Sequence, residues 1–203
     1  MAPTGYEEFG WIGVTRPRIA AKHMEENLAY HAARLVLLIR WSGKPRKSRS
    51  ARLPGIEGRT LWAKLDFFLR YPAYLKLAAQ ILEQSFSDEE LGLVPDDETR
   101  SVESRMVRYL YGPWDHIYYP VLAYLIGKNL VTVELNRNVE VFRLTQEGME
   151  LADRLSTDPA YISLVQRANT AYRLFNKYSG TRLKDFIYEY FPEIVNREIG
   201  AII

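Results

Sequence analysis

The spacing of hydrophobic positions changes twice within residues 105–148. Aromatic and apolar residues alternate with arginines from Met106 to Tyr111, which predicts a half-buried strand that Gly112-Pro113 ends. An apolar helix follows. Pro120 suits its first position, and Gly127-Lys128-Asn129 combines the residue types that stop a helix.

After this helix stop, alternation with a period of two returns. Apolar and polar residues alternate from Val131 to Leu135, and the chain returns from Val139 to Leu144 across the tip Asn136-Arg137-Asn138. Thr145 is a suitable cap for a further helix over residues 146–155. A helix, a two-stranded ribbon and a closing helix in this order predict the second half of a winged helix, a variant of the helix-turn-helix.

Two earlier helices complete this predicted core. Residues 24–41 carry an apolar stripe with i, i+4 spacing that predicts a mostly enclosed helix, and residues 60–70 have one apolar side. A helix over residues 72–84 reads as an insertion. We therefore expect a mainly α protein with a small β-hairpin: a winged helix-turn-helix core with an inserted helix and a C-terminal helical extension.

The positions of the predicted helices and strands divide the chain into three parts. Residues 1–23 form an N-terminal tail, residues 24–156 the winged-helix domain, and residues 157–203 a C-terminal helical docking extension. Within the domain we expect a basic loop at residues 44–58 and an acidic linker at residues 85–103.

Composition narrows the function classes. The chain has 203 residues, of which 47% are hydrophobic, so it can bury one or two cores. It has 27 Lys plus Arg against 25 Asp plus Glu, and a net charge of +2 gives no whole-molecule attraction to nucleic acid. The absence of cysteine excludes disulfides and zinc ribbons. Without a signal peptide or a long apolar run, we expect a cytoplasmic protein with no membrane contact.

One short segment concentrates positive charge. Five cations and no acid lie between Lys44 and Arg52, so this segment is either a solvated loop or a loop that contacts DNA phosphates. Arg137 at the predicted wing tip is a further phosphate candidate. The candidate phosphate contacts are Lys44, Arg46, Lys47, Arg49, Arg52 and Arg137.

The central helix lacks the side chains that read bases. A DNA-reading helix presents Arg, Asn, Gln or Ser to the major groove, whereas no charged or amide residue lies between His116 and Lys128. Its tyrosines are more typical of contacts with another protein, although such rings also stack single-stranded bases. The candidate partner contacts are Trp114, His116, Tyr118, Tyr119, Tyr124, Phe186 and Tyr190.

Catalytic and cofactor chemistry finds no support in the residue pattern. His116 and Asp115 suit the start of a helix, and His31 lies in an apolar helix that favours a core or interface position. The acidic residues of 85–103 match no ligand spacing, and Gly55 and Gly58 lack the pattern of a nucleotide cradle. We expect no catalytic residue, no metal and no cofactor, and therefore not an enzyme.

Four strings together resemble a known family. They are HAARLVLLIRW (31–41), GRTLWAKLDFFLRYP (58–72), YLYGPWD (109–115) and SGTRLKDFIYEYFPEI (179–194). Over roughly residues 25–195 the chain resembles the small middle component of three-component ABC-ATPase defence systems, the Lamassu-like group. The resemblance implies a non-catalytic subunit that sits with an SMC-like ATPase, which senses DNA, and with a separate effector that is often a nuclease.

Two hypotheses follow. In the first, the chain is an adaptor subunit of an anti-phage complex that bridges the ATPase and the nuclease-type effector and meets DNA through the complex. In the second, it is a winged-helix transcriptional regulator that binds an operator as a dimer. The wing and the basic loop favour the second hypothesis. The apolar central helix and the near-neutral charge favour the first.

Overall fold

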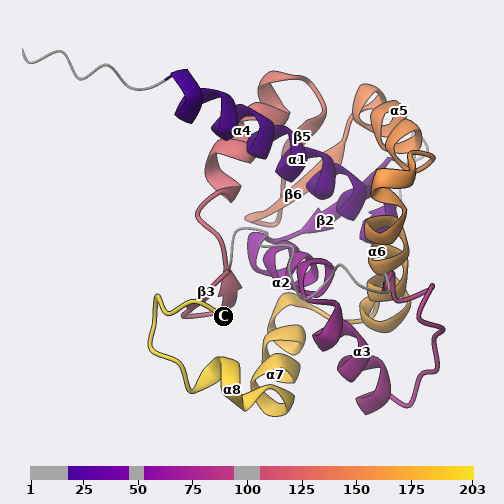
Figure 1. Cartoon of the computed structure of the whole chain (residues 1–203), viewed down its shortest axis with the longest axis vertical. Helices are drawn as coiled ribbons and strands as arrows, with labels where there is room; N and C mark the ends of the chain where they lie inside the picture. The colour runs from indigo at the N-terminus through magenta and orange to yellow at the C-terminus, as the bar shows by residue number, and fades with distance from the viewer. Residues whose placement is uncertain (1–17, 46–52, 94–105) are drawn as a thin grey trace, which may run out of the picture.

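The computed structural model describes residues 18–45, 53–93 and 106–203, with side chains from residue 28 onward (Figure 1). The helices are α1 (Arg18–Ser42), α2 (Arg59–Arg70), α3 (Pro72–Ile81), α4 (Tyr118–Gly127), α5 (Gln146–Leu155), the 3-10 turn η1 (Pro159–Tyr161), α6 (Ile162–Phe175), α7 (Gly180–Tyr190) and α8 (Pro192–Val195). The strands are β1 (Lys44–Pro45), β2 (Pro54–Glu57), β3 (Val107–Tyr109), β4 (Gly112–Trp114), β5 (Val131–Asn136) and β6 (Val139–Leu144).

The larger sheet defines the fold. It is antiparallel with the strand order β1-β2-β6-β5, and α1 crosses in front of it in Figure 1. Because β2 comes between α1 and α2, the chain runs helix, strand, helix, insertion, helix, strand, strand. This order is consistent with a winged helix in which α1, α2 and α4 are the three helices and β5 and β6 the wing. The predicted mainly α fold with a small hairpin is confirmed.

The segment predicted as a loop over residues 44–58 contains two strands, and residues 46–52 lie outside the described residues. Residues 44–45 and 54–57 are strands, and β2 occupies the middle of the sheet between β1 and β6. Two of the four residues of β2 are Pro54 and Gly55, so the segment lacks the alternation that marks a strand in sequence. Its pairing partner β6 lies about 85 residues away along the chain.

The predicted strand over residues 106–111 was wrong in its extent. Only Val107–Tyr109 is a strand, and the chain then turns so that Gly112–Trp114 pairs back as β4. Gly112 has φ +114°, a backbone conformation that suits glycine. Pro113 fits in β4 because it lies opposite Arg108, at a position whose missing N–H faces away from β3. On the other side of β3, the chain end adds an isolated bridge between Val107 and Ile202.

Helix α2 is the centre of the core. Every residue from Trp62 to Arg70 is buried, because α1, α3, α6, α7, β2 and β4 all pack around it. The charged residues of this helix are therefore enclosed together with its apolar ones. The consequence is a buried ionic cluster in the middle of the molecule.

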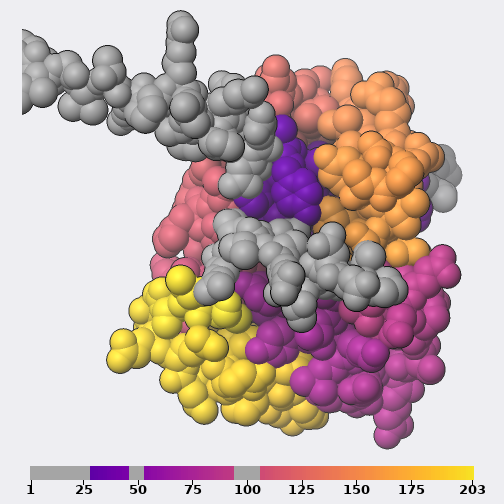
Figure 2. Space-filling model, viewed as in Figure 1, coloured from indigo at the N-terminus to yellow at the C-terminus, as the bar shows by residue number. Residues whose placement is uncertain are grey.

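The C-terminal helices belong to the same core. Phe68 of α2 lies 4.6 Å from Phe175 of α6 and 6.2 Å from Phe191, measured between ring centroids. In Figure 2 the yellow C-terminal residues lie directly against the violet and magenta residues of α2 and α3. Residues 157–203, expected as a docking extension, thus complete the hydrophobic cluster that the winged-helix elements begin.

The acidic stretch at residues 85–103 is only partly described. Residues 94–103 lie outside the described residues, whereas the first part packs on α6. Leu91 is buried, and Arg167 donates a hydrogen bond of 2.9 Å to the Gly92 carbonyl. Glu90 accepts a hydrogen bond of 2.6 Å from Arg173. This part of the predicted linker is therefore attached to the core.

A close approach fastens α5 to the end of α4. Thr145 caps α5 by accepting a bond from the Gly148 N–H, as predicted, and its own N–H donates to the Leu130 carbonyl. A Cβ atom at Gly148 would overlap the carbonyl oxygen of Leu130. Only glycine fits here, since any side chain would push α5 away from the link between α4 and β5.

Candidate interaction surface

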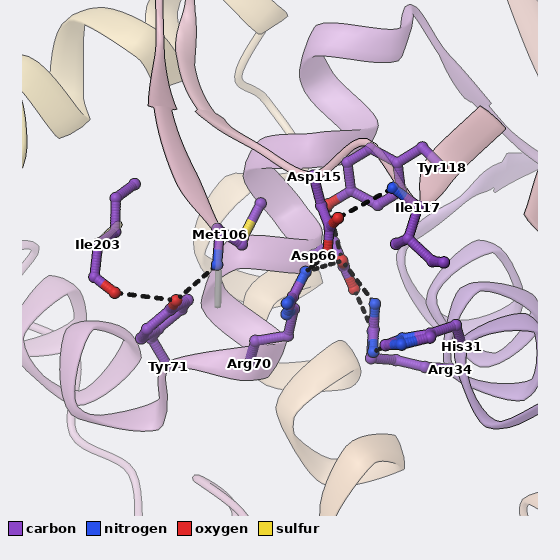
Figure 3. Close-up of polar contacts among 10 residues, drawn as sticks. All are labelled: His31, Arg34, Asp66, Arg70, Tyr71, Met106, Asp115, Ile117, Tyr118 and Ile203. Carbon is purple, nitrogen blue, oxygen red and sulfur yellow. Dashed lines mark hydrogen bonds and ion pairs between the residues drawn. The ribbon is translucent and has the colours of Figure 1, made fainter. Parts of the chain in front are cut away.

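The position of α4 is fixed from inside the protein by a polar cluster. The Tyr118 hydroxyl donates a hydrogen bond of 2.7 Å to Asp66 Oδ2 in α2. Arg34 of α1 binds the same carboxylate through two nitrogens, at 2.7 and 3.2 Å. Figure 3 shows that these side chains come from three different helices and converge on Asp66. The cluster ties the first turn of α4 to α1 and α2.

The turn that leads into α4 is held by a second carboxylate. Asp115 Oδ2 accepts a hydrogen bond of 2.8 Å from Arg70, and its Oδ1 accepts one of 2.9 Å from the Ile117 N–H (Figure 3). This second bond satisfies a backbone donor near the helix start. The helix begins at Tyr118, so the prediction that Pro120 is its first residue was wrong by two positions.

Burial and neighbouring charges shift the pKa of Asp66, Tyr118 and His31. Burial alone would raise the pKa of Asp66, but Arg34 and Arg70 lower it below its ordinary value. Burial raises the pKa of Tyr118 well above its usual range, and the Asp66 charge adds to this effect. Burial and the charge of Arg34 lower the pKa of His31 to about 4. The His31 Nδ1 lies 2.7 Å from Arg34, so the neutral ring accepts a bond from the guanidinium.

The outer face of α4 is open and apolar. Tyr119 is 54% exposed and Ile126 is 46% exposed, and both lie on the same helix side as Ala123, with i, i+4, i+7 spacing. Pro120, which is also exposed, borders them. This face offers no arginine or amide side chain to a base edge, although in its place along the chain α4 corresponds to the helix that reads DNA in a winged helix.

A groove continues this face toward β3 and β4. It has a volume of about 160 Å³. Its aromatic walls are Tyr109, Tyr111, Trp114 and Tyr119, and its remaining lining is Arg59, Thr60, Ala63, Gly112 and Pro113. Trp114 lies 6.0 Å from Tyr109 and 6.0 Å from Tyr119 between ring centroids, so the rings form a connected row. Tyr111, which also lines the groove, is 59% exposed.

Arg59 connects the groove to the wing. Its guanidinium lies 5.9 Å from the Tyr119 ring centroid and donates a hydrogen bond of 2.6 Å to Glu140 in β6. The hydrogen bond with Glu140 raises the pKa of Arg59 further. Arg59 is therefore a fixed positive charge at the edge of an otherwise aromatic surface.

The predicted partner contacts divide into two groups. Tyr118 and Phe186, expected to face a partner, are buried in this chain's own core at 4% and 5% exposure. Phe186 packs against Phe175 and Phe191. The other predicted contacts are accessible: Tyr119, His116 and Tyr190 are exposed, while Trp114 and Tyr124 are half-buried.

These accessible residues do not all lie in one place. Trp114 and Tyr119 share the groove, but Tyr190 belongs to α7, where it packs on Phe186. No role was predicted for Arg59, and Tyr109 and Tyr111 were placed only in the predicted half-buried strand over residues 106–111. The aromatic residues of YLYGPW were the sequence signal that could have indicated the groove. The pairing of β4 with β3, which builds the groove, was not predicted.

The candidate phosphate contacts are only partly described. Arg46, Lys47, Arg49 and Arg52 lie outside the described residues. Lys44 is exposed in β1, and Arg137 is exposed at the tip of the wing, where it has φ +48° and Asn138 has φ +67°. These two positive values belong to a two-residue hairpin turn that matches the right-handed twist of β5 and β6.

The described residues also bear on metal sites and on membrane spans. They contain no cluster of three or more side chains suited to a metal ion, and none of their helices has the length and apolar character of a membrane span. Comparison of the chain with protein-family models, with curated proteins and with solved structures gives no match. The fold and the surface itself are therefore the basis for a functional proposal.

Proposed function

We propose that the chain is a non-catalytic adaptor subunit of an anti-phage defence complex, which bridges an SMC-like ABC ATPase and a nuclease-type effector. Its sequence resemblance to the middle component of Lamassu-like systems suggests these two partners. The observation that carries the adaptor role is the apolar outer face of α4, Tyr119, Ala123 and Ile126, at the position where a DNA reader presents polar side chains.

The groove beside α4 supports protein contact for a separate reason. Tyr, Trp and Arg are the residues that contribute most to protein interfaces, and the groove brings these three types together in Tyr119, Trp114 and Arg59. The cluster around Asp66 holds the first turn of α4 in place. A surface fixed in this way loses less conformational freedom when a partner binds.

The test is co-purification of the full complex. The chain, carrying Tyr119→Glu or Ile126→Glu in the outer face of α4, is co-expressed with the products of its neighbouring genes, among which the proposal expects the ATPase and the effector. The matched control is Ile162→Glu, which changes a residue of similar exposure (43%) in α6. We expect each α4 variant to lose one partner and the control to retain both. Retention of both partners by both α4 variants would refute the adaptor role of this face.

The wing favours a second candidate, a DNA-binding regulator. Arg137 and Lys44 are exposed cations, and Arg137 stands at the tip, where a wing reaches phosphates. Binding of the isolated chain to DNA from its own promoter region tests this candidate. A complex that Arg137→Glu weakens, with a salt slope reduced by about one, supports the regulator. Absence of binding by the wild-type chain excludes it.

A further inference from the structure

The β5 edge of the larger sheet has free hydrogen-bonding groups. The wing turns through two residues, so Asn136 and Val139 form its closing pair, which exchanges backbone hydrogen bonds in a hairpin of this type. Bonding alternates along an antiparallel pair. The backbone groups of Thr132, Glu134 and Asn136 therefore bond to β6. By the same alternation, the N–H and C=O groups of Val131, Val133 and Leu135 point away from β6.

Two hydrogen bonds fix this alternation independently. The Leu130 carbonyl accepts from Thr145, as a residue of the bonded set must, at 3.1 Å. The Glu140 carbonyl, opposite Leu135, points away from β5 and accepts from Gly58 at 2.8 Å. In the part of the chain that the structure describes, the outward groups of β5 bond to no other backbone. Val131 is 1% exposed, so the accessible part of this edge consists of the groups of Val133 and Leu135, which an extended strand matches.

This edge also lacks the usual protection against pairing. Exposed edges commonly carry proline, a bulge or free charges. β5 contains no proline, its register with β6 is continuous, and its single charge, Glu134, lies 3.3 Å from Arg143. Leu135 is 75% exposed and Val133 is 38% exposed on the edge strand. The strand thus offers both free backbone groups and open apolar side chains.

We propose that β5 pairs antiparallel with β5 of a second copy of this chain, about a twofold axis through Val133. In this register Val133 faces its own equivalent, and the exposed Leu135 approaches Val131 of the second copy, which is 1% exposed in the single chain. All of the outward-pointing groups then meet outward-pointing groups. The two four-stranded sheets become one continuous sheet.

The strand's own sequence selects this occupant and this register. Apolar side chains face apolar side chains on one side of the joined sheet, and Thr132 faces Glu134 of the second copy on the other. A shift of the axis to residue 134 would place the two Glu134 carboxylates opposite each other, which is unfavourable. β5 is therefore self-complementary in side-chain type and in charge, as an isologous interface requires.

This inference does not depend on the proposed adaptor role. It uses the edge of β5, whereas the adaptor role uses the outer face of α4 and the adjacent groove. Monomeric protein with an intact α4 face would still co-purify with its partners, and a dimer would still form if no partner bound. Each proposal can fail alone.

Disulfide cross-linking tests the register, because the natural chain contains no cysteine. In the proposed dimer the two residues at position 133 form a bonded pair with Cα atoms about 5.5 Å apart, which a disulfide can span. We expect Val133→Cys to give a covalent dimer on mild oxidation. Thr132→Cys is the matched control: its two copies are offset by two residues, about 8 Å apart, beyond disulfide reach.

Mass measurement tests the interface without cross-linking. We expect the wild-type chain to elute at twice its 23.6 kDa mass in size-exclusion chromatography with light scattering. Val133→Pro removes only an outward N–H, and Leu135→Lys places a charge against Val131 of the second copy, so both should be monomeric with unchanged circular dichroism. Ile199→Lys, at another exposed apolar position, should remain dimeric.

Three results would overturn the proposal. They are a monomeric wild-type chain at all concentrations, Val133→Cys without covalent dimer, or equal cross-linking by Thr132→Cys. Failure of Val133→Pro to fold would leave the decision to Leu135→Lys, which changes a side chain that is 75% exposed and so does not depend on the wing's own hydrogen bonds.

Discussion

Tyr118 and Tyr119 are neighbours in sequence and opposite in environment. Tyr118 is 4% exposed and donates its hydroxyl to a buried carboxylate, whereas Tyr119 is 54% exposed beside an open groove. The same division continues along α4. Val121 and Leu125 are fully buried on the inner face, and Ala123 and Ile126 are exposed on the outer face. One side of this apolar helix therefore packs into the core, and the other side is exposed and can contact a partner.

The difference between the two faces comes from charge. An apolar helix would ordinarily be expected to bury every side. Here the inner face is selected because Tyr118 can reach Asp66, and Asp115 can reach Arg70. These interactions fix the rotation of α4 about its axis and leave the outer residues uncovered. The following experiments separate the two faces.

The largest effect is expected from Asp66→Asn. It removes the buried countercharge that Arg34 binds at 2.7 Å, while Arg70 keeps its bond to Asp115, and the change should lower the free energy of unfolding by about 3–5 kcal/mol. The control is Glu140→Gln at the partly exposed Arg59 pair, where a loss below about 1 kcal/mol is expected. Urea denaturation measures both. Equal losses would show that the cluster does not position α4.

A pH titration should reveal His31. Its pKa of about 4 in the folded state lies below the unfolded value of 6.5, so acid protonates the unfolded chain first. Stability should therefore fall between pH 6.5 and pH 4, by about 3 kcal/mol if the full shift is expressed. His31→Asn should remove this slope while the loss from Asp66, at lower pH, persists. An unchanged slope in the variant would assign it to other groups.

Tyr118→Phe should have an intermediate effect. The substitution keeps the ring that stacks on Trp62 at 5.7 Å but removes one of the donors to Asp66. We expect a loss of about 1–3 kcal/mol in the free energy of unfolding, because the carboxylate remains buried with one fewer partner. Thermal denaturation monitored by circular dichroism measures it. A neutral result would mean that the arginines alone satisfy Asp66.

Tyr119→Ala should have the smallest effect on stability, within about 0.5 kcal/mol, since the side chain is mostly exposed. Its effect should appear in partner co-purification instead. A large loss of stability would show that Tyr119 is a structural residue like its neighbour, and the comparison between the faces would fail.

The sequence was sufficient for features that depend on local chemistry. Thr145 caps α5, and Asn129 takes the left-handed conformation at φ +53° where a helix stop was expected. The wing tip at residues 136–138 and the enclosed helix α1 were also predicted. In each case, neighbouring residues carry the whole signal.

Features that depend on distant partners were not predicted. β2 is a strand because β6 is beside it, and its residues Pro54-Gly55-Ile56-Glu57 show no alternation of their own. Phe186 and Tyr118 have the composition of interface residues, but the chain buries both internally. Which tyrosine of the pair 118–119 faces inward depends on Asp66, more than 50 positions earlier.

Gly148 illustrates how such a molecule would respond to a genetic screen. It lies on neither face of α4 and touches no candidate surface, yet a methyl group there would collide with the Leu130 backbone and push α5 away from the link between α4 and β5. Alanine at this position should disrupt the proposed adaptor role as completely as a change in the outer face. In a library selected only for phenotype, this glycine would therefore be scored as a contact residue, and only a folding assay run in parallel would classify it correctly.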